Sequence, residues 1–151
     1  MKSLDNIRDA ISSIDFQDVE NNFVQYKVMR LYSDQTTECL SGNDKTKANT
    51  KVGVYRHRIV DGPIMYVGKA ERCTISQRQT SHFTTFRHTH NTNERTGMKY
   101  RKYIKDNSLQ YIDIVVEYLD MTQYPKMMIP MFELQLMEYY QPLINQETFN
   151  A

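Results

Sequence analysis

Two tyrosines, an arginine, a histidine and a glutamate have types and spacings that could do chemistry together. Tyr55 and Tyr66 lie on either side of an Asp-Gly turn in the stretch GVYRHRIVDGPIMYVGKA. Arg78 and His82 are four residues apart, so on a helix they project from neighbouring positions of one face. Such a pair can hold a phosphate and move a proton. Glu133 falls in an apolar stripe, where a carboxylate needs a cation, a hydrogen-bond donor or a metal.

Each of these residues also has a plainer structural interpretation. Tyrosines are common in half-buried strands. Arg78 can be a surface arginine and His82 a histidine at the edge of the core, and Glu133 can form an ion pair with a basic residue. The residues taken one by one therefore leave both interpretations open.

The turn between the two tyrosines predicts where their side chains point. If the Asp-Gly pair is the tip of a tight turn, Tyr55 faces Gly68, His57 faces Tyr66, and the two tyrosines are diagonal neighbours on one face. Gly68 would leave open space beside the ring of Tyr55, which predicts a shallow site rather than a filled core. Pro63 leaves an alternative open, because a wider, odd-numbered loop would place the tyrosines on opposite faces.

Two helices are expected to carry the other candidates. TISQRQTSHFTTFRH opens with a capping box of Thr74 and Gln77 and predicts a helix over 75–87. The last helix is expected over about 131–140, with Glu133 inward and Glu138 outward. Asn145 follows the end of that helix and is expected to tie the chain back onto the domain.

The remaining elements complete an α+β prediction. A polar, turn-rich stretch over 33–51 is expected to be a linker after a small N-terminal piece. The other expected elements are a helix over 4–14, a strand over 23–32, a hairpin over 52–69, a short basic helix around 100–105 and a strand over 109–119.

Charge is distributed unevenly along the chain. The net charge of +1 is the sum of −4 over residues 1–44, +11 over 45–105 and −6 over 106–151. A basic segment of this kind is typical of a surface that binds phosphates, although it is also found in folds that neutralise their own charge. The candidate nucleic-acid contacts are Arg56, Arg58, Arg72, Arg87, Lys99, Arg101 and Lys102.

Several classes of protein are disfavoured by composition. Only two cysteines occur, without a CxxC or a zinc-like spacing, so a reducing compartment is expected. No stretch approaches a membrane span, and the N-terminus is too acidic for a signal peptide. We expect a soluble, cytoplasmic protein of a prokaryote or of a phage-infected host, with no membrane partner.

Taken together, these stretches resemble the GIY-YIG nuclease superfamily. GVY at 53–55 matches the first signature and YVG at 66–68 the second, with the usual short hairpin between them. RQTSHF is similar to the helix that carries the family's arginine, and ELQLMEYYQPLIN to the last helix, which begins with the metal-binding glutamate and closes with Pro and Asn. The resemblance covers about residues 50–147.

The resemblance implies a fold and a division of the chain. The fold is α+β, with a central three-stranded, mainly antiparallel sheet flanked by helices and an N-terminal helix and strand extension. Residues 1–49 would be that extension with its linker, and 50–151 the nuclease domain. Two residues more than usual lie before the arginine helix, so Arg72 competes with Arg78 for the role of catalytic arginine, and RQTSHF favours Arg78.

The resemblance also implies a metal and a set of roles. Glu133 would bind one Mg²⁺, or Mn²⁺, per active site, and Arg78 would grip nonbridging phosphate oxygens. Tyr55 would deprotonate the attacking water with help from Lys69 or the metal, and Tyr66 would orient the water or the phosphate.

The other family positions have supporting roles. His82 would share the proton traffic or bind phosphate, while Gly53, Gly68 and Asn145 would be structural. The implied activity is that of a DNA endonuclease of restriction type or phage origin, acting on double-stranded DNA and open to forming a homodimer.

Four alternatives stay open at this point. They are a homing-type or repair-type nuclease of the same family, a nucleic-acid-binding module without catalysis, a small protein that binds an acidic partner, and a nuclease that acts on RNA.

Overall fold

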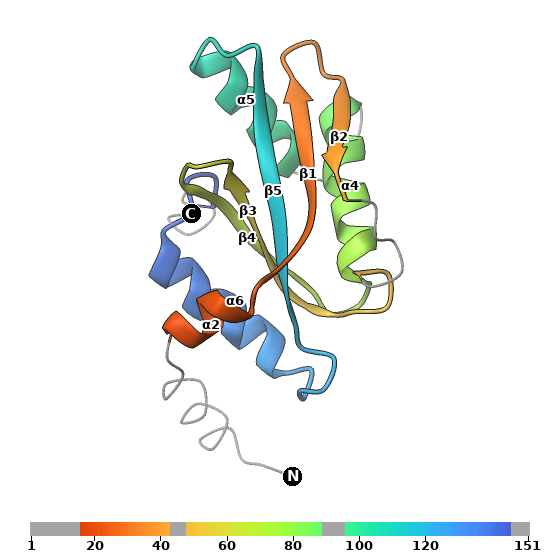
Figure 1. Cartoon of the computed structure of the whole chain (residues 1–151), viewed down its shortest axis with the longest axis vertical. Helices are drawn as coiled ribbons and strands as arrows, with labels where there is room; N and C mark the ends of the chain where they lie inside the picture. Colours follow the sequence, from red (N-terminus) through yellow and green to blue (C-terminus); the bar gives the residue numbers. More distant parts are fainter. Residues whose placement is uncertain (1–15, 43–47, 89–95, 146–151) are drawn as a thin grey trace.

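The computed structural model of the chain describes residues 16–42, 48–88 and 96–145. Within them, four helices and five strands form an α+β fold (Figure 1). The elements in chain order are α2 (Phe16–Asn22), β1 (Val24–Tyr32), β2 (Thr37–Ser41), β3 (Gly53–Ile59), β4 (Ile64–Ala70), α4 (Ile75–Arg87), α5 (Thr96–Asp106), β5 (Tyr111–Asp120) and α6 (Met128–Tyr140).

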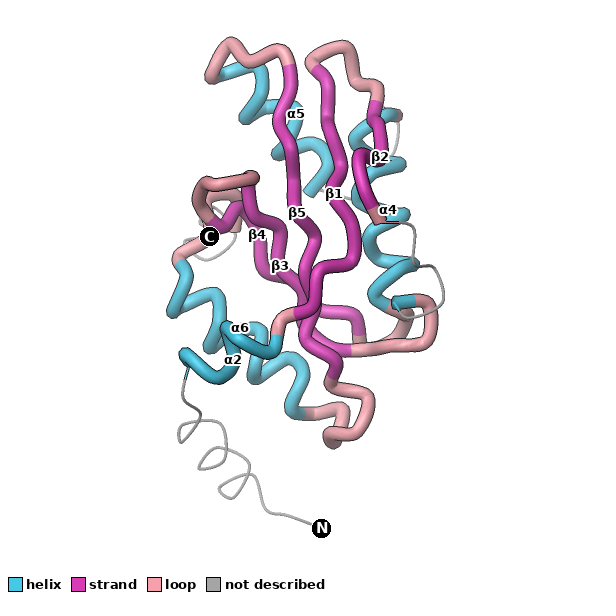
Figure 2. Tube along the Cα trace, viewed as in Figure 1, coloured by secondary structure: helices cyan, strands magenta, loops and turns pink. Residues whose placement is uncertain are grey.

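The strands form one five-stranded sheet in the order β2-β1-β5-β3-β4, and all neighbours are antiparallel. Figure 2 shows β1 and β5 running side by side through its centre. The prediction of three strands was wrong in number, because β5 pairs with β1 on one edge as well as with β3 on the other. The α+β class is the one expected.

The segment expected to be a linker contains β2. Its sequence, TECLS, has no clear alternation of apolar and polar residues, and four of its five side chains are exposed. It becomes a strand because it pairs with β1 in a hairpin, with Leu31 opposite Thr37. The helix expected over 4–14 lies outside the described residues, and the division of the chain at residue 49 stays a prediction.

The hairpin of β3 and β4 has the register that its turn predicted around the tyrosines. Tyr55 pairs with Gly68 and His57 with Tyr66, while a bulge after His57 shifts the pairing nearer the turn. Asp61 adopts a positive φ of 56°, and the carbonyl of Pro63 accepts a hydrogen bond from the Ile59 N–H at 3.1 Å. The loop between Ile59 and Pro63 therefore has three residues, and the bulge after His57 offsets this odd number, so that both tyrosines share one face.

Helix α4 starts and ends as its sequence predicted. Thr74 and Gln77 form a capping box, which satisfies two backbone N–H groups at the start of the helix. Its buried side includes the apolar residues Ile75, Phe83 and Phe86 and three polar ones, Gln79, His82 and Thr85.

Helix α6 begins three residues earlier than expected, at Met128, because Pro130 is tolerated within the first turn of a helix. The helix ends where Gln141 adopts the left-handed conformation, at a φ of 50°, just before Pro142. Leu143 continues the helical spacing of Leu136 and Tyr140, but it lies beyond the end of α6 and is exposed, whereas Met137 is buried.

The sheet has a hydrophobic core on each face. One core joins β1 and β5 to α4 and α5, through residues such as Leu31, Ile114, Phe86 and Ile104. The other joins β3 and β4 to α2 and α6, through Val54, Val67, Val19, Phe132 and Leu136. Side chains alternate along a strand, so Tyr55 and His57 face the first core, whereas Val54 and Arg56 face the second.

Within the described ranges, no helix is long and apolar enough to cross a membrane.

Candidate active site

Five polar rings gather between the hairpin and helices α4 and α5. We call them the ring cluster: Tyr55, His57, Tyr66, His82 and Tyr100. The rings of Tyr55 and Tyr66 are 6.0 Å apart between centroids, and His82 lies 5.7 Å from the first and 5.4 Å from the second. Strand pairing and α4 therefore bring together three of the residues proposed for chemistry.

Tyr55 and His82 are joined directly. The hydroxyl of Tyr55 lies 2.5 Å from Nε2 of His82, and both residues are 0% exposed. The shallow, open site expected beside Gly68 was therefore wrong. A Cβ at Gly68 would lie 2.5 Å from the Tyr55 hydroxyl and 2.7 Å from Cε1 of Tyr66, because the rings fill that space.

Four charged residues form a second group, which we call the charged group: Lys69, Glu71, Arg78 and Glu133. Burial raises the pKa of Glu133 above its ordinary value, and the carboxylate of Glu71 adds to the rise, whereas Lys69 and Arg78 oppose it. The ammonium of Lys69 lies 3.0 Å from the Glu71 carboxylate. Glu133 is therefore a half-buried carboxyl group that two cations, Lys69 and Arg78, influence electrostatically.

The two groups are connected through α4 and β4. Arg78 belongs to the charged group and His82 to the ring cluster, and they lie one turn apart on α4. On β4, Gly68 faces the ring of Tyr55, whereas Lys69 pairs across the hairpin with Val54 and lies on the α6 side. Lys69 was expected to assist proton transfer by Tyr55, but it lies on the other side of β4, and the hydrogen-bond partner of the phenol is His82.

The residues present fit a magnesium ion. Within residues 16–42, 48–88 and 96–145, no three His, Cys, Asp or Glu side chains gather as a metal-binding group. Mg²⁺ does not need such a group, because it keeps several waters and is commonly held by one or two carboxylates together with substrate phosphates. The half-buried carboxylate of Glu133, with Glu71 close to it, is a donor set of that kind.

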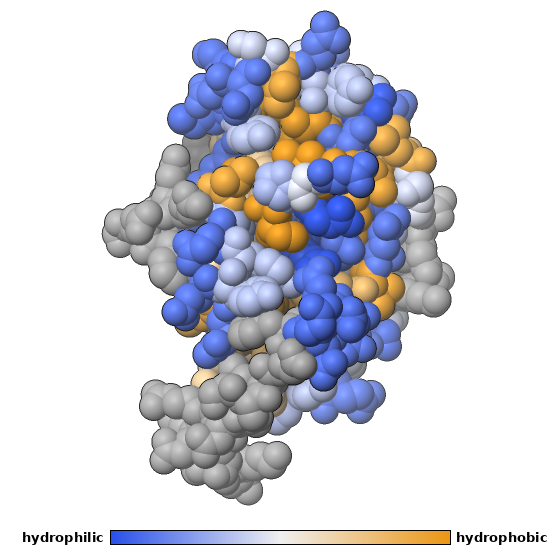
Figure 3. Space-filling model, turned by 60° about the vertical axis from the view of Figure 1, so that its left-hand side comes forward, coloured by the Kyte–Doolittle hydropathy of each residue, from blue (hydrophilic) through white to orange (hydrophobic). Residues whose placement is uncertain are grey.

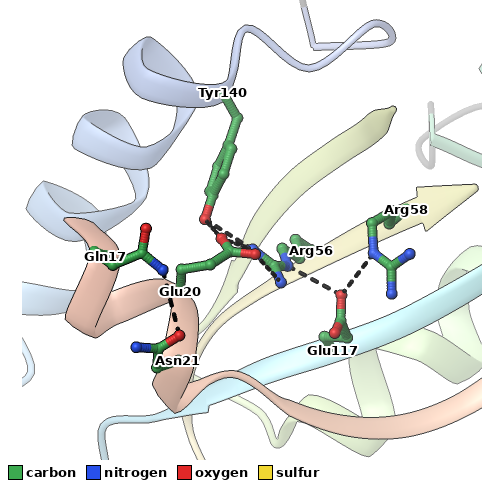
Figure 4. Close-up of polar contacts among 7 residues, drawn as sticks. All are labelled: Gln17, Glu20, Asn21, Arg56, Arg58, Glu117 and Tyr140. Carbon is green, nitrogen blue, oxygen red and sulfur yellow. Dashed lines mark hydrogen bonds and ion pairs between the residues drawn. The ribbon is translucent and has the colours of Figure 1, made fainter. Parts of the chain in front are cut away.

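Two of the candidate DNA contacts are used inside the protein instead. Arg56 is 3% exposed and donates to Glu20, Glu117 and the hydroxyl of Tyr140 (Figure 4). Arg58 lies 3.3 Å from Glu117. We call these five residues the arginine cluster. Its members face the α2 and α6 side of the sheet, so the structure does not offer Arg56 to DNA, and it offers Arg58 only as part of an ion pair.

The electrostatics of the arginine cluster follow from its contacts. The hydrogen bond from Arg56 lowers the pKa of Glu20, with Tyr140 contributing and burial opposing. Burial and the hydrogen bond to Glu20 raise the pKa of Tyr140, which keeps it a donor. The guanidinium of Arg56 also lies over the ring of Phe23, at 4.1 Å from its centroid. The cluster thus attaches α2 and α6 to β3 and β5.

Other candidate contacts have internal partners too. Arg101 donates to the backbone oxygens of Phe86 and Thr85, which caps the end of α4. Arg87 donates to Thr37, Lys99 to the carbonyl of Ile144, and Lys102 pairs with Asp106. Part of the basic excess in the sequence is therefore structural. Arg72 is exposed in the loop that leads into α4.

The structural candidates have definite contacts. The side chain of Asn145 accepts a hydrogen bond from the Val67 N–H at 2.7 Å and donates one to the Val67 carbonyl at 3.1 Å, which attaches the chain to β4. At Gly53, where φ is 152°, a Cβ would lie 2.1 Å from the Leu119 carbonyl oxygen. Only glycine fits there.

The surface is chemically mixed rather than uniformly basic. Figure 3 shows hydrophobic side chains gathered in the middle of one face and hydrophilic ones around them. Exposed apolar residues on the described surface include Leu134 and Tyr139 of α6 and Leu143 after it.

Sequence reasoning passed over three members of the site. His57, Gln79 and Tyr100 are each 0% exposed, and the nitrogens of His57 lie 2.6 Å from Gln79 Oε1 and 2.6 Å from the Tyr100 hydroxyl. Two signals could have found His57 and Gln79. His57 follows Tyr55 by two residues on a strand, and Gln79 follows Ile75 by four on a helix, so both share a buried face.

Comparison of the chain with protein-family models, with curated proteins and with solved structures found no match.

Proposed function

We propose that this chain is a Mg²⁺-dependent endonuclease that hydrolyses phosphodiester bonds of double-stranded DNA through a GIY-YIG-type site. The supporting observation is convergence. Tyr55 on β3, Tyr66 on β4 and His82 on α4 meet in the ring cluster, and α4 also carries Arg78 toward Glu133 of α6. The resemblance assigns roles to the same residues, and they come from four separate segments.

In the proposed reaction the oxygen of a water molecule attacks phosphorus, and the bond to the leaving oxygen breaks. Bound Mg²⁺ would supply positive charge that stabilises the leaving oxygen. The phenol of Tyr55 takes a proton from the water while it passes its own proton to Nε2 of His82, which lies 2.5 Å away. This partner removes the need for a phenolate before the reaction starts.

The remaining residues would act on the phosphate. Arg78 is always cationic and would hold nonbridging oxygens, where negative charge grows in the transition state. Tyr66, which is half-buried at the edge strand β4, would orient the water or the phosphate. Glu133 would hold the metal. We propose a restriction-type or phage-encoded enzyme, which would cut both strands as a homodimer or in two successive nicks.

Cleavage of a supercoiled plasmid tests this function. The parent protein is expected to nick or cut it with Mg²⁺ and not with EDTA. Glu133→Gln should abolish cutting, and Arg78→Ala should slow it by about 100-fold to 1,000-fold. Glu138→Gln on the exposed side of α6 is the matched control and should cut normally. Arg72→Ala, in the loop before α4, tests the competing arginine and should slow cutting much less than Arg78→Ala. Strong loss in Arg72→Ala but not in Arg78→Ala would move the phosphate contact to Arg72.

A second candidate is a nucleic-acid-binding module without catalysis. It is favoured by one observation, the complete burial of Tyr55 and His82, which keeps both from bulk water in this structure. Such a module would bind DNA with steep salt dependence and would leave duplex DNA, single-stranded DNA and RNA uncut with Mg²⁺ or Mn²⁺. That result would overturn the enzyme and support the module.

A further inference from the structure

His57 is a fully enclosed titratable residue that the proposed reaction does not use. It is 0% exposed and lies in the middle of β3, on the face that meets α4 and α5. Its two ring nitrogens bond to two different helices, Nε2 to Gln79 of α4 and Nδ1 to Tyr100 of α5. One side chain thus fixes both helices to the hairpin.

The chemistry of the partners sets the tautomer of His57. Gln79 presents its carbonyl oxygen, which can only accept, so Nε2 of His57 carries the proton. Burial raises the pKa of Tyr100 well above its ordinary value, so its hydroxyl keeps a proton beside Nδ1, 2.6 Å away. Both ring nitrogens of His57 therefore have a hydrogen-bond partner.

Gln79 is held in this place by His57. Its Nε2 is buried and has no hydrogen-bond partner among the described residues, so the bond to His57 is the one that secures the amide. Leaving a buried donor unsatisfied is unfavourable, and the hydrogen bond from His57 to Oε1 of Gln79 offsets part of that cost. Gln79 lies between Arg78 and His82 on α4, so a bond at this point fixes both the rotation and the height of that helix against β3.

The imidazole of His57 also contacts the rings proposed for catalysis. Its centroid lies 5.5 Å from that of Tyr55, 5.6 Å from Tyr66 and 5.6 Å from His82. Phe83 and Tyr100 stack with it at interplanar angles of 19° and 25°. The ring of His57 therefore cannot tilt without moving the three rings around it.

We propose that His57 is a positioning residue, which holds Tyr55 and the α4 residue His82 at hydrogen-bond distance through its bonds to Gln79 and Tyr100. The chemical part of this role rests on the proposed function. The geometric part does not, because the bond between Tyr55 and His82 can be observed in a protein that cuts nothing.

The test uses three proteins beside the parent. His57→Phe keeps a ring of similar size and loses both hydrogen bonds. A triple variant, His57→Phe with Gln79→Leu and Tyr100→Phe, removes the partners as well, so that no buried polar atom is left unsatisfied. Tyr26→Phe is the matched control, since the hydroxyl of Tyr26 makes another bond from the sheet to α4, to Ser76 at 3.2 Å.

Each protein is measured for thermal stability, for plasmid cleavage with Mg²⁺, and by NMR for the nitrogen and hydrogen resonances of the histidine rings. We expect His57→Phe to lose the hydrogen-bond signal between Tyr55 and His82 and to lower kcat by about 100-fold with KM nearly unchanged, because small displacements of reacting groups have effects of this size. The triple variant should regain stability but neither the signal nor kcat. Tyr26→Phe should keep both.

The outcomes separate the two proposals. If the triple variant regains the signal or kcat together with its stability, His57 is only a structural residue and the inference is overturned. If the parent does not cut but His57→Phe still loses the Tyr55 to His82 signal, the positioning role stands and the proposed function fails. A parent and a His57→Phe variant with the same signal would overturn the positioning role whatever the activity.

Discussion

The two faces of β3 bury polar groups in contrasting ways. On the α4 and α5 side, the ring cluster consists of tyrosines and histidines, with no carboxylate or guanidinium, and Tyr55, His57 and His82 are all 0% exposed. On the α2 and α6 side, the arginine cluster is ionic, and its carboxylate Glu20 has a side chain that is 41% exposed. Hydrogen-bonded tyrosines and histidines can be enclosed completely, whereas the buried charge of Arg56 needs carboxylate partners, and one of these, Glu20, remains in contact with water.

This difference also separates what the two faces can do. In the Tyr55 and His82 pair a phenol can pass a proton to an imidazole, which is an ordinary proton acceptor near neutral pH. Arginine, by contrast, does not give up its proton in proteins, so the ion pairs of Arg56 cannot carry a proton transfer. The ring cluster is therefore suited to chemistry, and the arginine cluster to fixing α2 and α6 on the sheet.

The largest expected effect is on the ionic face. Arg56→Met should lower the free energy of unfolding by about 3 kcal/mol, at the low end for a broken buried ion pair because Glu20 can regain water. Urea denaturation measures it. Lys102→Met, which removes an exposed pair with Asp106, is the control and should change stability by less than about 1 kcal/mol. Equal losses of unfolding free energy in the two variants would show that the buried contacts of Arg56 stabilise the fold no more than an exposed ion pair does.

On the face that carries the ring cluster, Gly68→Ala should destabilise the protein by about 2 kcal/mol, because its new methyl group collides with Tyr55 and Tyr66. The same variant should weaken cleavage if the proposed function holds. Gly62→Ala at the hairpin turn is the control, since its methyl group would meet the side chain of Ile59 at 3.0 Å and should cost less. A neutral result at Gly68 would contradict the filled site described above.

A smaller effect concerns the acid limb of the stability profile. The lowered pKa of Glu20 means that its ionised form stabilises the fold above the ordinary pKa, and that this contribution is lost as pH falls through the lowered value. Glu20→Gln should therefore reduce stability at pH 7 by up to about 1 kcal/mol and have no effect at the lowest pH. Unfolding free energies across acidic pH provide the measurement. If the difference in unfolding free energy between the parent and Glu20→Gln stayed constant with pH, the effect would come from altered packing and not from the lost charge.

Glu133 should behave in the opposite sense. Its pKa is raised, so the fold is favoured by the protonated form, and that contribution is lost as pH rises through the raised value. Glu133→Gln should be more stable than the parent at pH 8 and equal to it well below the ordinary pKa of a glutamate. Melting temperatures at several pH values test this. Saturating Mg²⁺ should raise the melting temperature of the parent and not that of the variant.

The weakest expected effect compares two arginines in DNA binding. Each phosphate contact contributes about 0.9 to the slope of log K against log salt concentration. Arg72→Gln, in the exposed loop before α4, should reduce that slope by about one contact. Arg58→Gln should leave the slope unchanged, because Arg58 faces Glu117 on the other side of the sheet. Equal changes of the salt slope in the two variants would show that Arg58 also contacts DNA.

Local patterns in the sequence were enough for the hairpin, α4 and α6. The positions of the tyrosines around the turn, the capping box at Thr74 and the helical spacing of apolar residues each depend on near neighbours. The five-stranded sheet could not be derived in this way. Tyr32 pairs with Tyr111 and Val24 with Tyr118, and nothing close to either strand encodes that match.

For the candidate site too, the features that depend on near neighbours could be predicted, and those that depend on residues far away in the chain could not. Residue types and spacing pointed to Tyr55, Tyr66 and His82, but the burial of Tyr55 depends on α4 lying across the hairpin. The role of Arg56 depends on Glu20 and Glu117, which are far from it in the chain, so its charge alone suggested a DNA contact. His57 was aligned with Tyr66 from the start, yet only its two partners on α4 and α5 reveal its importance.

The position of β5 has a consequence for how the protein is made. β5 is the last of the five described strands, yet it lies between β1 and β3 and pairs with both. During synthesis the β1–β2 and β3–β4 hairpins can each form early, but they have no shared strand until residue 120 has been translated. Their inner edges stay unpaired during that interval, and joining strands so far apart in sequence is slow. A pause in translation shortly before β5 would therefore expose two hairpin edges at once to association with other chains.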